Sequence, residues 1–226
     1  MAAMRSSAPC WLWLVVAVFS IPLEVVSQEP DRPNVIVIVS DDQGWADIGY
    51  HNPKVYSPRL DALAASGVTF TRHYVMPQCT PTRIALLTGR YPSRFGPKSQ
   101  QASNEPAFPL GTPTLATMFL AEGYETYLCG KWHLGSKQDH GPNQHGFQHS
   151  YGSLAGAIGM YEHRYRNGKF ANTWHRDGQL IEGAENGVHA TDLTASEAVR
   201  VIETKRDAPY FLYLAFIIYI IRDEIL

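Results

Sequence analysis

The sequence predicts an α/β protein with a mostly parallel sheet flanked by helices. Two observations favour this class. Strand-like apolar runs alternate along the chain with helix-like segments, and the first run, residues 34–40 (NVIVIVS), is dominated by β-branched residues. A continuous run of this kind is typical of a parallel strand that is buried on both faces. The alternation itself is typical of a parallel sheet with helices on both sides.

Length and composition narrow the class of protein. The chain has 226 residues, of which 45% are hydrophobic, and this is enough for one buried core. Its 19 basic and 21 acidic residues nearly balance, which argues against a general nucleic-acid-binding protein. Its 3 cysteines are too few for a small disulfide-rich fold.

The first 27 residues have the pattern of a secretory signal peptide. Arg5 is followed by an apolar run over residues 10–21, and the small residue Ser27 precedes the expected cleavage site. A membrane anchor is the alternative, but about 20 apolar residues are needed to span a bilayer and this run is shorter. We therefore expect a cleaved signal peptide at residues 1–27, a domain over residues 28–226, and no transmembrane segment after cleavage.

Proline and glycine mark the helices in the rest of the chain. Pro58 lies just inside, and Gly67 just beyond, a helix predicted over residues 57–66. Pro81 likewise suits the first turn of a helix that begins near Cys79. The other predicted elements are helices over residues 112–122 and 191–203, strands over residues 124–129 and 210–216, and long loops with short strands over residues 135–187.

Two adjacent carboxylates follow the first predicted strand. Asp41 and Asp42 lie at its carboxyl end, which is where parallel sheets bind ligands. Adjacent carboxylates repel one another unless a cation or hydrogen-bond donors are present, and Ca²⁺ prefers such oxygen ligands. The pair is therefore a candidate metal site, with a solvated turn or a helix cap as the alternative.

Cys79 is the candidate nucleophile. At the N-terminus of a helix, the free amides and the helix dipole favour negative charge on its thiol or on a bound anion. Arg83, one turn later, can point back to the same place. Because a signal peptide leads to an oxidising compartment, a Cys79–Cys129 disulfide is one alternative, and a buried free thiol is another.

Lys131 and His133 follow the predicted strand over residues 124–129 and so also lie at a carboxyl end. A lysine offers a point charge to an anionic group, and a histidine can move a proton near neutral pH. A surface loop is the alternative for each residue taken alone. One sheet edge would nevertheless bring them together with Asp41, Asp42 and Cys79.

Three of these segments together resemble the motifs of the sulfatase family. Residues 79–83 (CTPTR), followed by LLTGR, resemble the signature Cys-x-Pro-x-Arg. Residues 40–45 (SDDQGW) resemble the first metal-binding loop of the family, and residues 130–135 (GKWHLG) resemble its second active-site loop. The order and spacing are most similar to those of the arylsulfatase B-like group, and the resemblance covers residues 32–216.

The resemblance implies that Cys79 is oxidised to formylglycine by the formylglycine-generating enzyme. The hydrated aldehyde would carry two hydroxyls: one attacks sulfur, and the other allows sulfate to be expelled. Asp41 and Asp42 would bind Ca²⁺, which would also contact the modified Cys79.

The resemblance also implies roles for three further residues. Arg83 would hold the modified side chain, and Lys131 would bind that side chain or the sulfate. His133 would polarise the formylglycine hydroxyls.

The end of the chain departs from the family pattern. After Phe216 the sequence reads IIYIIRDEIL, where relatives carry a sulfate-facing histidine. Their later half also supplies an Asp-Asn or Asp-Gln metal pair, another active-site lysine and a smaller domain. We therefore expect a fragment or truncated isoform with an incomplete sheet and weak or absent catalysis.

Two alternative functions stay open. Beside a sulfuric ester hydrolase, the first alternative is an inactive sulfatase that at most binds sulfated ligands. The second alternative is a phosphatase or phosphodiesterase of the same superfamily. The second class usually has a Ser or Thr nucleophile, so Cys79 favours a sulfatase. The resemblance implies a sulfated carbohydrate or an aryl sulfate as substrate, and the lysosome, the endoplasmic reticulum lumen or secretion as the destination.

Overall fold

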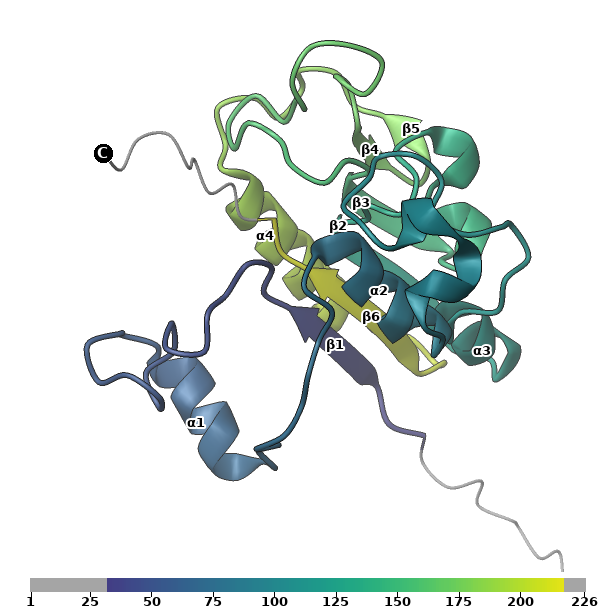
Figure 1. Cartoon of the computed structure of the whole chain (residues 1–226). Helices are drawn as coiled ribbons and strands as arrows, with labels where there is room; N and C mark the ends of the chain where they lie inside the picture. Colours follow the sequence, from purple (N-terminus) through teal and green to yellow (C-terminus); the bar gives the residue numbers. More distant parts are fainter. Residues whose placement is uncertain (1–31, 218–226) are drawn as a thin grey trace, which may run out of the picture. The chain divides into compact units, whose positions relative to one another are not determined.

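A six-stranded sheet organises the part of the chain that the computed structural model describes, residues 32–217 (Figure 1). The strand order is β1-β6-β2-β3-β4-β5, with the first four strands parallel and the last two antiparallel. The predicted mostly parallel α/β fold is confirmed. The expected signal peptide and residues 218–226 lie outside the described part. The strands are β1 (Val35–Val39), β2 (Glu125–Lys131), β3 (His149–Ser153), β4 (Trp174–Arg176), β5 (Gln179–Leu180) and β6 (Tyr210–Ala215).

Helices cover both faces of the central strands. One face of β2 and β6 packs against the helices in front of the sheet in Figure 1, with Leu128 and Phe211 among its buried residues. The opposite face, which includes Tyr127 and Leu212, packs against the helix behind the sheet. Alternate residues therefore enter two separate cores, as expected for strands buried on both sides. The α-helices are α1 (Pro58–Ser66), α2 (Cys79–Thr88), α3 (Leu115–Ala121) and α4 (Ala190–Glu203), and short 3₁₀ helices cover Pro92–Phe95, Pro97–Ser99, Gln138–His140 and Pro142–His145.

The first strand corrects one prediction. We expected β1 to be buried on both faces, but Ile36 is 40% and Ile38 is 53% exposed. Their neighbours Val35, Val37 and Val39 point to the other face and pack against the core. The prediction was wrong because β1 is the edge strand of the described sheet and pairs only with β6 there.

Local sequence signals account for where the helices begin and end. α1 begins at Pro58 as predicted, although it buries none of its side chains. α3 begins at Leu115, later than predicted, because the Thr114 side chain accepts a hydrogen bond from the backbone of Thr117 and caps the helix there. α2 ends at Gly89, whose left-handed backbone lets its N–H bind the Ala85 carbonyl.

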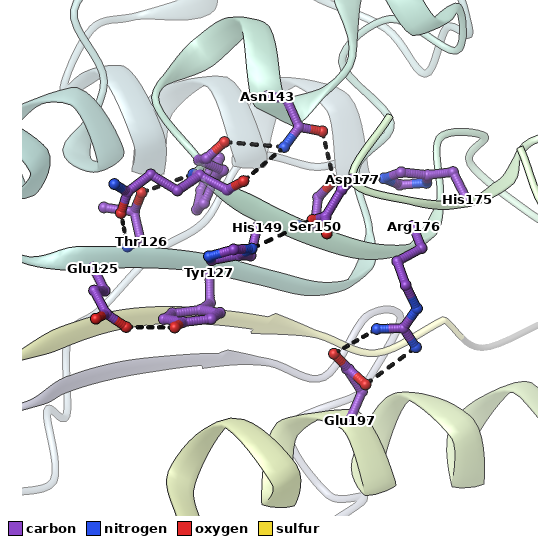
Figure 2. Close-up of polar contacts among 12 residues, drawn as sticks. Glu125, Thr126, Tyr127, Asn143, His149, Ser150, His175, Arg176, Asp177 and Glu197 are labelled. Carbon is purple, nitrogen blue, oxygen red and sulfur yellow. Dashed lines mark hydrogen bonds and ion pairs between the residues drawn. The ribbon is translucent and has the colours of Figure 1, made fainter. Parts of the chain in front are cut away.

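The region from 135 to 187 contains short strands between loops, as predicted. Its β4 is joined to α4 by a bidentate ion pair between Arg176 and Glu197, at 2.9 and 3.2 Å (Figure 2). Burial alone would raise the pKa of Glu197, but hydrogen bonds from Arg200 and Arg176 outweigh burial and lower it. The ion pair therefore holds the antiparallel edge of the sheet to the helix behind it.

Buried histidines, His145 and His175 among them, make stability depend on pH. Burial lowers the pKa of both His145 and His175 to about 4. The ring nitrogens of His145 have no hydrogen-bond partner, and its ring packs on Phe108 at 4.6 Å. Because the unfolded chain binds protons at these groups near their ordinary pKa of 6.5, stability is fully present above that value.

We expect the free energy of unfolding to fall as pH is lowered from about 7 to about 5, with each histidine contributing up to roughly 1.4 kcal/mol per pH unit. Urea unfolding at the two pH values measures this effect. His145→Phe should reduce the slope, whereas the exposed His73→Phe should leave it unchanged. An unchanged slope in His145→Phe would contradict the assignment.

No helix among residues 32–217 is both long enough and apolar enough to cross a membrane.

Candidate active site

Three segments meet at the carboxyl end of the parallel strands. Asp41 follows β1, Lys131 is the last residue of β2, and His133 follows two residues later. β6 lies between β1 and β2, so their carboxyl ends share one edge. Cys79 is the first residue of α2, as predicted. The structure therefore brings together candidate residues that lie far apart in the sequence.

The candidate nucleophile contacts the candidate proton carrier. The Sγ atom of Cys79 lies 3.2 Å from Nδ1 of His133. Burial, and then the charges of Lys131 and Arg83, lower the pKa of His133 to about 3. The imidazole is therefore neutral near pH 7, and one of its nitrogens can accept a proton from a group at position 79.

Both cysteines that follow the expected signal peptide are free thiols. Cys79 is partly exposed, and Cys129 is buried in the core. The disulfide alternative is therefore wrong for this structure. Burial raises the pKa of Cys129 to about 12, so this second thiol is poorly suited to act as a nucleophile.

Asp41 lies at the centre of a buried charge cluster. Its Oδ2 accepts a hydrogen bond of 2.7 Å from the Nζ atom of Lys131, and its Oδ1 lies 3.5 Å from an Nη atom of Arg83. Arg83 also donates to the carbonyl oxygen of Lys131 at 2.8 Å and to the hydroxyl of Tyr213 at 3.4 Å. The side chain of Arg83 is almost fully buried, and its Nε has no hydrogen-bond partner.

A cavity of about 440 Å³ opens on this cluster, and Asp41, Asp42, Cys79 and Arg83 contribute to its lining. Asp42 is exposed, and both aspartates have left-handed backbones, with φ angles of 62° and 46°. Asp41 and Asp42 thus present oxygen donors beside position 79, as a hard cation requires. The donor set is partial, because residues 32–217 contain no group of three His, Cys, Asp or Glu side chains placed to hold a metal ion.

Three residues that the sequence analysis missed fix the position of His133. The hydroxyl of Thr80 donates to the carbonyl oxygen of His133 at 3.1 Å. Gly156 lies against its ring, and the Oδ1 atom of Asn104 accepts a hydrogen bond of 3.0 Å from the Gly156 amide. Only Thr80 lies within a recognisable motif, residues 79–83, whereas Asn104 and Gly156 lie in loops.

The close approach of Gly156 predicts a sensitive position. A Cβ atom there would lie 2.2 Å from two atoms of the His133 ring. We expect Gly156→Ala to displace the ring and to lower the free energy of unfolding by about 1–3 kcal/mol. Urea unfolding tests this, with Gly67→Ala as the control, because Gly67 has φ −116° and its nearest contact is at 3.3 Å. Equal effects of the two substitutions would contradict the prediction.

The fold and the site define an α/β protein that gathers an acidic pair, a helix-terminal cysteine and a Lys-His pair at one sheet edge. The family model described as Sulfatase matches residues 33–217. The chain belongs to the sulfatase family. This confirms the family resemblance of the sequence motifs.

Curated relatives agree with this assignment. Arylsulfatase J of Mus musculus is 33% identical over 191 residues, which cover 82% of this chain and 32% of the relative. N-acetylgalactosamine-6-sulfatase of Homo sapiens is 33% identical over 207 residues, which cover 84% of this chain and 40% of the relative. The chain therefore spans less than half the length of these relatives.

Among solved structures, Ps i-CgsB is 32% identical and superposes with a TM-score of 0.73, covering 82% of this chain and 45% of that one. In a second structure, Ps i-CgsB is in complex with k-i-k-neocarrahexaose. That protein chain is 31% identical to this chain and superposes with a TM-score of 0.71, covering 82% of this chain and 45% of that one.

Proposed function

We propose that this chain provides the nucleophile-bearing part of a sulfuric ester hydrolase of the arylsulfatase type. One observation carries the proposal: Cys79, at the N-terminus of α2, contacts His133 and shares a cavity with Asp41 and Asp42. Hydrolysis of a sulfate ester needs three kinds of group: a nucleophile, a residue that accepts its proton, and oxygen ligands for a cation.

Formylglycine at position 79 is part of this proposal. Its formation replaces the thiol of Cys79 by an aldehyde, so that the side-chain carbon loses sulfur and two hydrogens and gains oxygen. Once hydrated, the group would supply one hydroxyl for attack on sulfur and a second hydroxyl that allows sulfate to leave. The partner in biosynthesis would be the formylglycine-generating enzyme.

The chain's own residues would orient this group and the substrate. His133, held neutral at its buried position, would accept a proton from the hydroxyl nearest Nδ1. Arg83 would bind an oxygen at position 79 through its unpaired Nε. Lys131 would bind sulfate, and this requires its ammonium to leave Asp41.

Calcium is the cation that this site would take. Asp41 and Asp42 would hold it beside position 79, where it would polarise an oxygen of the substrate. Two carboxylates alone supply too few oxygens for the 6–8 ligands that Ca²⁺ takes. The proposal therefore includes ligands from outside the described residues or from water.

The substrate would be a sulfated carbohydrate or an aryl sulfate. Relatives named N-acetylgalactosamine-6-sulfatase and a solved structure in complex with k-i-k-neocarrahexaose support a carbohydrate. The predicted signal peptide supports entry into the secretory pathway, and thus the lysosome, the endoplasmic reticulum lumen or the outside of the cell as the destination.

Two measurements on the full chain, expressed in a secretory host, test the proposal. We expect mass spectrometry of the Cys79 peptide to show the aldehyde, and we expect hydrolysis of p-nitrocatechol sulfate to be Ca²⁺-dependent but slow, because the donor set is partial. An intact thiol would refute the formylglycine mechanism. An aldehyde without turnover would favour the second candidate, an inactive chain that binds sulfated ligands, which the partial donor set supports.

A further inference from the structure

Three lysines gather around one carboxylate near the candidate active site. Lys169 forms an ion pair with Glu105. The hydrogen bond from Lys169, together with the charges of Lys169, Lys98 and Lys137, lowers the pKa of Glu105 despite some desolvation. The charges of Lys98, Lys137 and Lys169 thus all act on Glu105, and we call these three residues the lysine cluster.

A cavity of about 400 Å³ adjoins the lysine cluster, and two of its lysines, Lys137 and Lys169, line the cavity. The cavity lining includes the polar side chains of five residues: Ser136, Lys137, Gln138, Lys169 and Asn172. Lys137 makes no ion pair within residues 32–217, so its ammonium is available to a ligand. The cavity volume lies within the range of small-ligand sites.

One acidic side chain, that of Asp139, also lines the cavity. Its carboxylate contacts Nδ1 of the neighbouring His140 at 3.0 Å. This pairing, followed by the charges of His140 and Lys137, lowers the pKa of Asp139. Asp139 is therefore paired with its neighbour His140, and Glu105 with Lys169, whereas Lys137 makes no such pair among residues 32–217.

The lysine cluster borders the residues that hold His133. Glu105 follows Asn104, whose Oδ1 binds both the Gly156 amide at 3.0 Å and the Ser136 hydroxyl at 2.9 Å. Gly156 in turn touches the His133 ring. Lys137 is four residues beyond His133, so their Cα atoms lie at most about 15 Å apart.

We propose that this cavity is a subsite for a second sulfate group on a sulfated oligosaccharide whose reacting sulfate lies at position 79. The inference rests on the proposed function and narrows its substrate to multiply sulfated carbohydrates. Lysines bind sulfate as point charges without a fixed geometry, and the uncommitted ammonium of Lys137 supplies the new contact. Glu105 competes with the ligand for Lys169.

Equilibrium binding to the full chain at low salt tests the subsite. The probes are a chondroitin disaccharide with two sulfates and its monosulfated counterpart. We expect the disulfated probe to bind about fivefold more tightly, and Lys137→Ala to remove most of this preference, since one exposed ion pair changes affinity by up to about fivefold. Lys205→Ala is the matched control, because Lys205 is exposed and precedes β6 at the opposite end of the sheet.

Glu105→Gln gives a result of opposite sign. Removing the competing carboxylate frees Lys169, so affinity for the disulfated probe should rise by about two- to fivefold while the monosulfated probe is unaffected. A merely structural role for these residues would not raise affinity. The proposal is overturned if wild type shows no preference for two sulfates, or if Lys137→Ala weakens both probes equally.

Failure of the subsite and failure of the proposed function are distinguishable. A Lys137-dependent preference in a chain whose Cys79 peptide keeps its thiol would support the subsite while refuting the formylglycine mechanism. Aldehyde formation and aryl sulfate hydrolysis without that preference would leave the proposed function intact and overturn the subsite.

Discussion

Asp41→Asn is expected to lower the free energy of unfolding by roughly 3–5 kcal/mol, because removing one member of a buried ion pair leaves its partners uncompensated. Lys131 and Arg83 both lose their carboxylate partner in this variant. Asparagine has nearly the same shape as aspartate and tolerates the left-handed backbone at this position. The loss of stability is therefore due to the missing charge rather than to backbone strain. Urea unfolding measures this loss.

Asp42→Asn is the matched control for this effect. Asp42 adjoins Asp41 and has the same left-handed backbone, but it is exposed, so its substitution should change stability by less than about 0.5 kcal/mol. Adding Lys131→Met to Asp41→Asn should restore part of the stability, since the uncompensated ammonium is removed. Similar losses at positions 41 and 42 would show that the buried charge cluster does not stabilise the fold.

The elements that the sequence predicted well are those with local signals. Pro58 marks the start of α1, and Pro81 lies in the first turn of α2, which begins at Cys79 as expected. The pairing of β3 with β4 depends on contacts between short, partly polar segments, which no local pattern specifies. Exposure of Ile38 on β1 also could not be read from the run itself, because burial depends on what lies opposite the strand.

In the candidate site too, some features could be predicted from the sequence and others could not. The rule that ligands bind at the carboxyl ends of parallel strands was enough to predict that Asp41, Lys131 and His133 meet. The ion pair between Lys131 and Asp41 was not predictable, because it depends on the packing of side chains 90 positions apart. The supports of His133, Asn104 and Gly156, likewise arrive from loops that have no periodic pattern.

Cys79→Ser is expected to abolish the steady turnover of p-nitrocatechol sulfate that the wild-type chain shows, because loss of an enzymatic nucleophile removes nearly all of the rate. A serine hydroxyl at this helix terminus would still lie next to His133 and could attack sulfur. It has no second hydroxyl with which to release sulfate, so we expect at most one turnover per molecule. Rapid-mixing measurements of the first turnover, compared with the steady-state rate, test this expectation.

Cys129→Ala separates this effect from a general need for thiols. Cys129 is buried in the core behind the sheet and does not face the cavity at Cys79. Its substitution should lower stability without changing turnover per folded molecule, because only Cys79 adjoins both the proton carrier and the acidic pair. Steady turnover by Cys79→Ser at more than a few per cent of the wild-type rate would mean that a single hydroxyl suffices, and the two-hydroxyl chemistry at position 79 would have to be abandoned.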